Sequence, residues 1–205
     1  MLYFANPCGS AAVMAHMKAG RLGFIATPGQ GNRLPAGVTW CADNGAYGKG
    51  FPGEEKWFAW LTRKARHVST CLFAVAPDVV GDAAATLARS LPWLPKIRAL
   101  GYPAALVAQD GLEGMEVPWD EFDVLFIGGT DAFKLGHAAA QLVREAKARG
   151  KRVHMGRVNS GKRFRYAMGL GCDSADGTKL VFGADANLHY VLEWASYDHA
   201  QGVLV

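Results

Sequence analysis

The chain has 205 residues, a mass of 22.0 kDa and a formal net charge of +4, a size that suits one domain. Half of its residues are hydrophobic and a fifth are charged, which excludes a disordered chain, and no apolar run approaches the ~20 residues that a membrane span needs. The N-terminus lacks the basic start and the long apolar stretch of a signal peptide, so we expect a cytoplasmic protein.

Short runs of β-branched or aromatic residues alternate along the chain with amphipathic stretches of helical length. The short runs predict strands at Leu2–Ala5, Leu22–Ala26, Val38–Ala42, Leu72–Ala76, Ala104–Ala108, Val124–Ile127 and Arg152–Met155, with a weak eighth near Cys172. The amphipathic stretches predict helices at Ser10–Gly20, Gly53–Val68, Asp82–Leu100, Asp131–Arg149, Ser160–Gly169 and Asn187–His199.

Strands that alternate with helices predict an α/β protein whose sheet is parallel and has right-handed crossovers. About eight strands favour a compact (β/α)8 barrel in a single domain that spans residues 1–205, and an open doubly wound sheet is the alternative. Eight strands in 205 residues require several connections that are short or free of helix, above all the one between Ala26 and Val38.

The cysteines and histidines give no sign of a metal site. Cys8, Cys41, Cys71 and Cys172 form no CxxC pair, and no group of Cys and His has zinc spacing, so we interpret the four as reduced, mostly buried thiols. The six histidines show neither a catalytic triad nor a metal spacing, and we interpret all six as structural. His154 precedes Met155 on a predicted strand and is expected to face away from any pocket that Met155 lines.

Functional groups of parallel α/β folds gather beyond the carboxyl ends of the strands. Six consecutive predicted strands are followed there by polar residues or glycine: Asp43, Asp78, Gln109 with Asp110, Gly128 with Gly129, Met155 with Gly156, and Asp173 with Asp176. Two carboxylates that face one pocket can divide the roles of nucleophile and proton donor in glycosyl transfer. A glutamine beside backbone amides of glycine can read the edge of a flat heterocycle, and aromatic and thioether groups can cover its faces. The pattern indicates a pocket for a nucleobase that is cut from, or joined to, a sugar.

Six short motifs follow one another in order between about Asn6 and Thr178: DNGAY, APDVVGD, AQDG, IGGT, VHMG and GxDxxDxT. This series resembles the tRNA-guanine transglycosylases (queuine tRNA-ribosyltransferase-like proteins), and resembles still more their small phage relatives, the DNA 7-deazaguanine transglycosylases. The resemblance implies a (β/α) barrel that exchanges guanine in a polynucleotide for a 7-deazaguanine base of the preQ0 type. It implies no metal and no redox cofactor, because an aspartate does the nucleophilic work.

The resemblance also implies roles for individual residues. Asp176 would be the nucleophile that attacks C1′ and forms a covalent glycosyl-enzyme, with Asp173 in a structural role; Asp173 as the nucleophile is the alternative. Asp43 would be the general acid/base, which protonates the departing guanine and deprotonates the incoming base. The residues that would bind the base are Asp78 and Gln109 at its polar edge, aided by the backbone of Gly128 and Gly129, and Tyr47 and Met155 on its faces.

Plainer interpretations of the same residues stay open. Asp43 opens an Asp-Asn-Gly turn signal, and Asp78 is placed to cap the loop before the next helix. Gly128 and Gly129 suit a tight turn, and Met155 suits a core position on a strand. Tyr47 could equally pack against neighbouring aromatic residues.

Three departures from the family pattern bear on the substrate. The usual DSGGF/Y-Q element reads DNGAYG here, no Cys-rich zinc site follows the nucleophile, and the chain is far shorter than the tRNA enzymes. The last two favour DNA over tRNA as the polymer. Lys162, Arg163 and Arg165, at the start of a predicted helix, are candidates for phosphate contacts, and a solvated helix face is the alternative.

Three further hypotheses remain beside the DNA enzyme. The same reaction could act on tRNA, or the barrel could bind a purine-like ligand without catalysis, alone or as a subunit beside an active partner. A third hypothesis is hydrolysis of a free nucleoside by the same two carboxylates. The family resemblance further implies a homodimer, and no membrane partner is expected.

Overall fold

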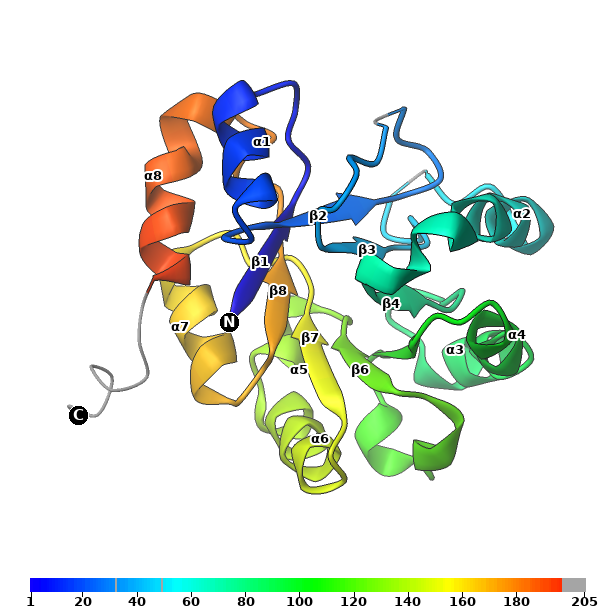
Figure 1. The fold of residues 1–205 in the computed structure, drawn as a ribbon. Coiled ribbons are helices and arrows are strands. Elements are labelled where there is room, and N and C mark those ends of the chain that lie inside the picture. The colour runs from blue at the N-terminus through cyan, green and yellow to red at the C-terminus, as the bar shows by residue number, and fades with distance from the viewer. Residues whose placement is uncertain (32, 49, 197–205) are drawn as a thin grey trace.

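The computed structural model describes residues 1–31, 33–48 and 50–196 of the chain. Eight parallel strands follow one another around a closed barrel in chain order, and the last strand pairs with the first (Figure 1). The strands are β1 (Leu2–Ala5), β2 (Gly23–Ala26), β3 (Trp40–Ala42), β4 (Cys71–Val75), β5 (Ala104–Ala108), β6 (Val124–Ile127), β7 (Arg152–Met155) and β8 (Ser174–Asp176). The prediction of a compact (β/α)8 barrel is confirmed, and the closed sheet excludes the open alternative.

Helices cover the outside of the barrel in the described residues (Figure 1). They are α1 (Ala11–Lys18), α2 (Glu54–Lys64), α3 (Ala83–Ser90), α4 (Leu94–Ala99), α5 (Asp131–Lys134), α6 (His137–Ala148), α7 (Gly161–Gly169) and α8 (Ala184–Ala195). Hydroxyl or carboxylate side chains cap α1, α3, α5 and α7, because each accepts a hydrogen bond from a backbone N–H three residues further on. Within the described residues, no helix has both the length and the apolar character to cross a membrane.

Two long helices of the prediction are each divided in the structure. The predicted helix Asp82–Leu100 is divided into α3 and α4 at Pro92, which has no N–H to continue the ladder of helical hydrogen bonds. The predicted helix Asp131–Arg149 is divided into α5 and α6 at Gly136, where a Cβ would lie 2.7 Å from the carbonyl oxygen of Ala132.

The remaining differences lie at the ends of elements. The predicted helix Gly53–Val68 ends as a 3-10 helix, Ala65–Thr70, and the weak eighth strand is β8. Residues 27–31 and 33–39, which connect β2 to β3, contain no helix, as expected. The predicted helix Asn187–His199 begins earlier, at Ala184, and its residues 197–199 lie outside the described residues.

Side chains of each strand alternate between the inside of the barrel and the layer beneath the helices. The inner set packs together and includes Phe4, Phe73, Val107 and Val124. The outer set is larger and packs the barrel against its helices. This alternation decides which strand residues can reach a cavity at the mouth of the barrel.

All four cysteines are free thiols, as the sequence predicts. Cys41, Cys71 and Cys172 are buried, and Cys8 is exposed. Burial raises the pKa of Cys71 and of Cys172 to about 12, so these two thiols are inert at neutral pH.

Candidate active site

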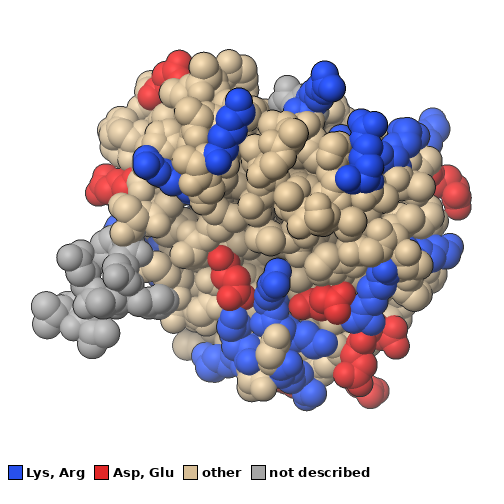
Figure 2. All heavy atoms as spheres, viewed as in Figure 1, with Lys and Arg blue, Asp and Glu red and all other residues tan. Residues whose placement is uncertain are grey.

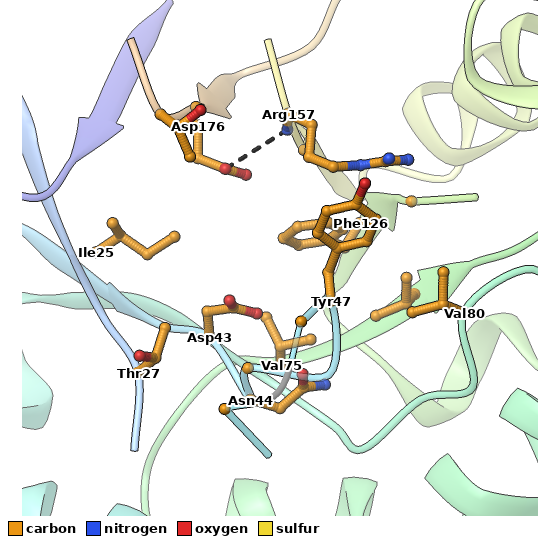
Figure 3. Close-up of a pocket in the computed structure, with 18 of the residues that line it drawn as sticks. Ile25, Thr27, Asp43, Asn44, Tyr47, Val75, Val80, Phe126, Arg157 and Asp176 are labelled. Carbon is orange, nitrogen blue, oxygen red and sulfur yellow. Dashed lines mark hydrogen bonds between the residues drawn. The ribbon is translucent and has the colours of Figure 1, made fainter. Parts of the chain in front are cut away.

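A cavity of about 590 Å³ opens at the carboxyl ends of the strands (Figure 3). The loops that follow the strands bring together most of the residues that the sequence singled out. Asp43, Tyr47, Asp78, Gln109, Gly128, Gly129, Arg163 and Asp176 all line it. Met155, Lys162 and Arg165 do not. No group of three or more His, Cys, Asp or Glu in the described part of the chain is arranged to hold a metal ion.

Two aspartates face each other in this cavity. Asp176 ends β8 and Asp43 directly follows β3, and Figure 3 shows both carboxyl groups directed into the space between them. Burial, followed by the negative charges of Asp176 and Asp78, raises the pKa of Asp43 from an ordinary 3.8 to about 7, although backbone N–H groups of Gly45 and Asn44 oppose this rise. The Asp43 carboxyl group can therefore give up and take back a proton near neutral pH.

Asp173, the other aspartate of the same motif, is held outside the cavity. It forms an ion pair with Lys147 at 2.8 Å, and its Oδ2 accepts a hydrogen bond from the backbone N–H of Val153. These contacts tie the start of β8 to α6 and β7. The expectation that Asp173 is structural agrees with this placement.

Asp78 and Gln109 form one buried polar network on the cavity wall. Gln109 Nε2 donates to Asp78 Oδ2 at 2.6 Å, and Asn44 Nδ2 donates to Asp78 Oδ1 at 2.7 Å. Burial raises the pKa of Asp78, and these two hydrogen bonds oppose the rise. Asn44 also donates to the carbonyl of Ala76 and accepts from the backbone N–H of Ala46. The sequence flagged Asn44 only as a departure from the family pattern; the structure shows that it fixes Asp78.

The backbone of Gly128 and Gly129 does not offer the free amides that the sequence suggested. The N–H of Gly128 donates to the carbonyl of Ala108, and the N–H of Gly129 donates to Gln109 Oε1 at 2.9 Å. Both donors are therefore used inside the protein, where they extend the sheet and orient Gln109. A side chain at position 128 would collide with Val107, since a Cβ there would lie 2.7 Å from Val107 Cγ1.

The expectation that Met155 covers one face of a bound base is wrong. Met155 is fully buried in the outer layer, because it is one of the β7 residues that point toward the helices. Phe126 of β6 lines the cavity instead. Tyr47 is 65% exposed at the cavity mouth and keeps the position expected of a stacking residue.

His154 is likewise not where the sequence placed it. Its ring lies inside the barrel, fully buried, at 4.6 Å from the ring of Phe126 and 5.0 Å from that of Phe73. Its Nε2 is 2.9 Å from Asp176 Oδ1, so it touches the candidate nucleophile. The alternation of β7 sends His154 inward by the same rule that sends its neighbour Met155 outward.

Arg157 is a cavity residue that the sequence analysis missed. Its guanidinium lies 4.1 Å from the centre of the Tyr47 ring and donates a hydrogen bond to the carbonyl of Gly129. Its backbone N–H lies 3.5 Å from Asp176 Oδ2. The backbone at this position is left-handed, with φ of 59°, which nothing in the residue type would indicate. Figure 3 shows this backbone N–H directed at Asp176 and the guanidinium extended over Tyr47.

The three basic residues predicted to contact phosphate separate into two groups. Arg163 lines the cavity and is ion-paired with Asp131 at 2.6 Å. Lys162 and Arg165 are exposed on α7, away from the cavity lining. Figure 2 shows Lys and Arg in several separate groups on the face that it displays, with Asp and Glu between some of them, and not as one continuous basic band.

The fold and this site define an eight-stranded (β/α) barrel with a polar, carboxylate-bearing cavity at the carboxyl ends of its strands. No family model matches the sequence, and no curated protein matches it significantly.

Several solved structures of different proteins have a fold similar to that of this chain. The chain is similar to tryptophan synthase from M. tuberculosis in an aminoacrylate-bound form, with a TM-score of 0.55 and 13% identity over 95% of this chain and 88% of that one. It is similar to the Amycolatopsis orientalis BexX/CysO complex, with a TM-score of 0.56 and 16% identity over 95% and 86%. It is similar to a mandelate oxidase mutant with an FMN adduct, with a TM-score of 0.61 and 13% identity over 95% and 70%. Identities this low establish the shared barrel and nothing about activity.

Proposed function

We propose that the protein is a glycosyltransferase that exchanges guanine in DNA for a 7-deazaguanine base through a covalent aspartyl-glycosyl intermediate. The observation that carries the proposal is the pair of carboxyl groups that share one cavity, Asp176 with a hydrogen-bonded Oδ1 and Asp43 with a pKa of about 7. The order of the six motifs supports the same reaction.

The two aspartates would divide the chemistry between them. In the first half-reaction, Asp176 Oδ2 bonds to C1′ while the bond from C1′ to guanine N9 breaks, and Asp43 supplies the proton that the departing base needs. In the second half-reaction, N9 of the incoming base bonds to C1′, its proton passes to Asp43, and the electron pair of the ester bond returns to Asp176. A proton carrier with a pKa near 7 suits both directions.

The Asp78–Gln109 network supports recognition of a guanine-like edge. Each oxygen of Asp78 accepts one hydrogen bond within the protein and keeps a lone pair for the N1–H and 2-amino donors of guanine. Gln109 uses one Nε2 hydrogen on Asp78 and keeps the other for an acceptor such as O6. Tyr47 and Phe126 provide the aromatic surface that the sequence assigned in part to Met155.

DNA is the proposed polymer because the sequence has no Cys-rich zinc site after Asp176 and is far shorter than the tRNA enzymes that its motifs resemble. Arg157, at the cavity mouth beside the nucleophile, is the residue best placed to meet a phosphate of a nucleotide turned out of the helix. The incoming 7-deazaguanine would use the same base site as guanine, so the exchange proceeds in a ping-pong order.

The test is an exchange assay with purified full-length protein, a 7-deazaguanine base, and labelled guanine in duplex DNA, in single-stranded DNA or in tRNA. We expect label to be released from DNA by the wild type and not by Asp176→Asn. His137→Met is the matched control, because His137 is exposed on α6 outside the cavity. Full release by Asp176→Asn would contradict the assignment of the nucleophile.

The other outcomes separate the alternatives. Release from tRNA alone would move the substrate to tRNA. Guanine released from a free nucleoside without an incoming base would indicate hydrolysis. Binding of a 7-deazaguanine without release from any polymer would favour a purine-binding barrel and would refute the proposal.

A further inference from the structure

His154 belongs to a chain of hydrogen bonds that ends on the candidate nucleophile. Its Nδ1 lies 2.8 Å from Ser174 Oγ, and its Nε2 lies 2.9 Å from Asp176 Oδ1. Ser174 and Asp176 both belong to β8, two residues apart, and so point to the same side of the strand. The register of β7 with β8 pairs His154 directly with Ser174. The sheet itself therefore fixes the three side chains relative to one another.

The surroundings hold the ring of His154 still. The side chain is fully buried, and the rings of Phe4, Phe73 and Phe126 surround it at centroid distances of 5.9, 5.0 and 4.6 Å. Close packing of this kind restrains the orientation of the ring. It also excludes water, which strengthens the hydrogen bond to Asp176.

The chemistry of the carboxylate fixes the direction of these bonds. An ionised Asp176 only accepts hydrogen bonds, so Nε2 must carry the hydrogen that it donates to Oδ1. In a neutral ring Nδ1 is then an acceptor, and it takes a hydrogen bond from the hydroxyl of Ser174. One oxygen of Asp176 is thereby fixed, and Oδ2 is left facing the cavity, where the backbone N–H of Arg157 is 3.5 Å away.

We propose that His154 is a positioning residue for the exchange reaction, which holds Asp176 Oδ1 in both half-reactions and makes the aspartyl ester easier to break. This inference rests on the proposed function. The attack uses Oδ2, and Oδ1 then becomes the carbonyl oxygen of the ester. A carboxylate accepts a stronger hydrogen bond than an ester carbonyl does. The bond from His154 therefore strengthens as the ester breaks, and it assists the second half-reaction.

Loss of this donor should slow the breaking of the ester more than its formation. In His154→Met, which has a similar volume and no donor, we expect the rate of exchange to fall roughly 10- to 100-fold, the range expected for a lost hydrogen bond to a charged group. We also expect a larger fraction of the protein to carry the covalent adduct at steady state, as intact-protein mass spectrometry can measure. His154→Gln keeps an N–H near the position of Nε2, so it should restore part of the rate and lower the adduct fraction.

A merely structural role of His154 would not raise the adduct fraction. His137→Met is the matched control, because it makes the same substitution at a histidine outside the cavity. Exchange by His154→Met with no gain in adduct would overturn the role of His154 and leave the proposed function intact. Absence of exchange by the wild type would overturn the proposed function, and this role with it.

A second measurement does not depend on the folding of variants. Nitrogen-15 NMR of the wild type reports which ring nitrogen of His154 carries the hydrogen. We expect hydrogen on Nε2, and a ring that carries hydrogen on Nδ1 alone would overturn the proposal.

Discussion

The buried carboxyl group of Asp43 makes a prediction about stability that needs no substrate. Asp43 has a pKa of about 7 in the folded protein, because burial and the charges of Asp176 and Asp78 penalise its ionised form, whereas the unfolded chain has the ordinary value of 3.8. Each factor of ten in proton affinity is worth ~1.4 kcal/mol, so the full difference corresponds to ~4 kcal/mol.

The sign follows from where the proton is held. Between pH 3.8 and pH 7 the folded protein keeps the Asp43 proton and the unfolded chain does not, so stability falls as the pH rises. Between pH 5 and pH 8 the wild type should lose about 3 kcal/mol of its free energy of unfolding through this residue. Asp43→Asn has no proton to lose, so its stability should exceed that of the wild type by a margin that grows with pH.

Urea denaturation of both proteins at pH 5, 6, 7 and 8 measures this margin. The difference between the two proteins removes the contribution of groups that titrate alike in both. Asp176→Asn is the matched control, since loss of the Asp176 charge should lower the pKa of Asp43 and flatten the pH dependence. A difference between wild type and Asp43→Asn that stays constant from pH 5 to pH 8 would refute the reasoning.

Three substitutions test other parts of the site. Asn44→Ala removes hydrogen bonds to Asp78 and to the backbone and should lower the free energy of unfolding by ~2–4 kcal/mol in urea denaturation. Gly177→Ala would place a Cβ against Tyr3 Oη and Asn159 Oδ1, and should cost ~1–3 kcal/mol in the same assay while lowering the exchange rate. Tyr47→Ala should change stability by less than ~0.5 kcal/mol, because Tyr47 is exposed, yet raise KM for DNA about tenfold. An unchanged free energy of unfolding in Asn44→Ala or Gly177→Ala would contradict the first or the second assignment, and an unchanged KM for DNA in Tyr47→Ala would contradict the third.

The sequence predicts the barrel well because its strands are buried on both faces. Such strands read as continuous apolar runs, and the bounds predicted for Leu2–Ala5, Ala104–Ala108 and Val124–Ile127 are those of β1, β5 and β6. The signal is weakest for β8, Ser174–Asp176, in which two of three residues are polar. Those polar residues face the inside of the barrel, so the same chemistry that forms the site weakens the signal of the strand.

One of the two helix breaks had a local signal that periodicity concealed. Apolar residues continue at helical spacing through Leu91 and Leu94, while Pro92 between them removes a backbone donor. The second helix is interrupted where Gly136 has an extended backbone, at a place where a Cβ would lie 2.7 Å from the carbonyl oxygen of Ala132. The first break is visible in the residue type, whereas the second depends on a contact that only the folded chain shows.

The site itself shows how far strand-end reasoning extends. Position along the chain predicts that Asp43, Asp78, Gln109 and Asp176 lie near the mouth of the barrel, and all four line the cavity. It does not predict which face of a strand points inward, because both faces of a barrel strand are apolar and the usual alternation of apolar with polar residues is lost. Arg157 escaped notice because its placement depends on a left-handed backbone.

The pairing of β7 with β8 would have resolved the orientation of Met155. Residues paired across neighbouring strands point to the same face, and Met155 pairs with Ala175. Asp176 follows Ala175 and therefore points to the opposite face from Met155. A catalytic Asp176 and a base-covering Met155 thus exclude each other once β8 is a regular strand, and an inward Asp176 requires His154 to point inward as well. The register of β7 with β8, together with a catalytic Asp176, therefore identifies His154 as the residue of β7 that lies beside the nucleophile.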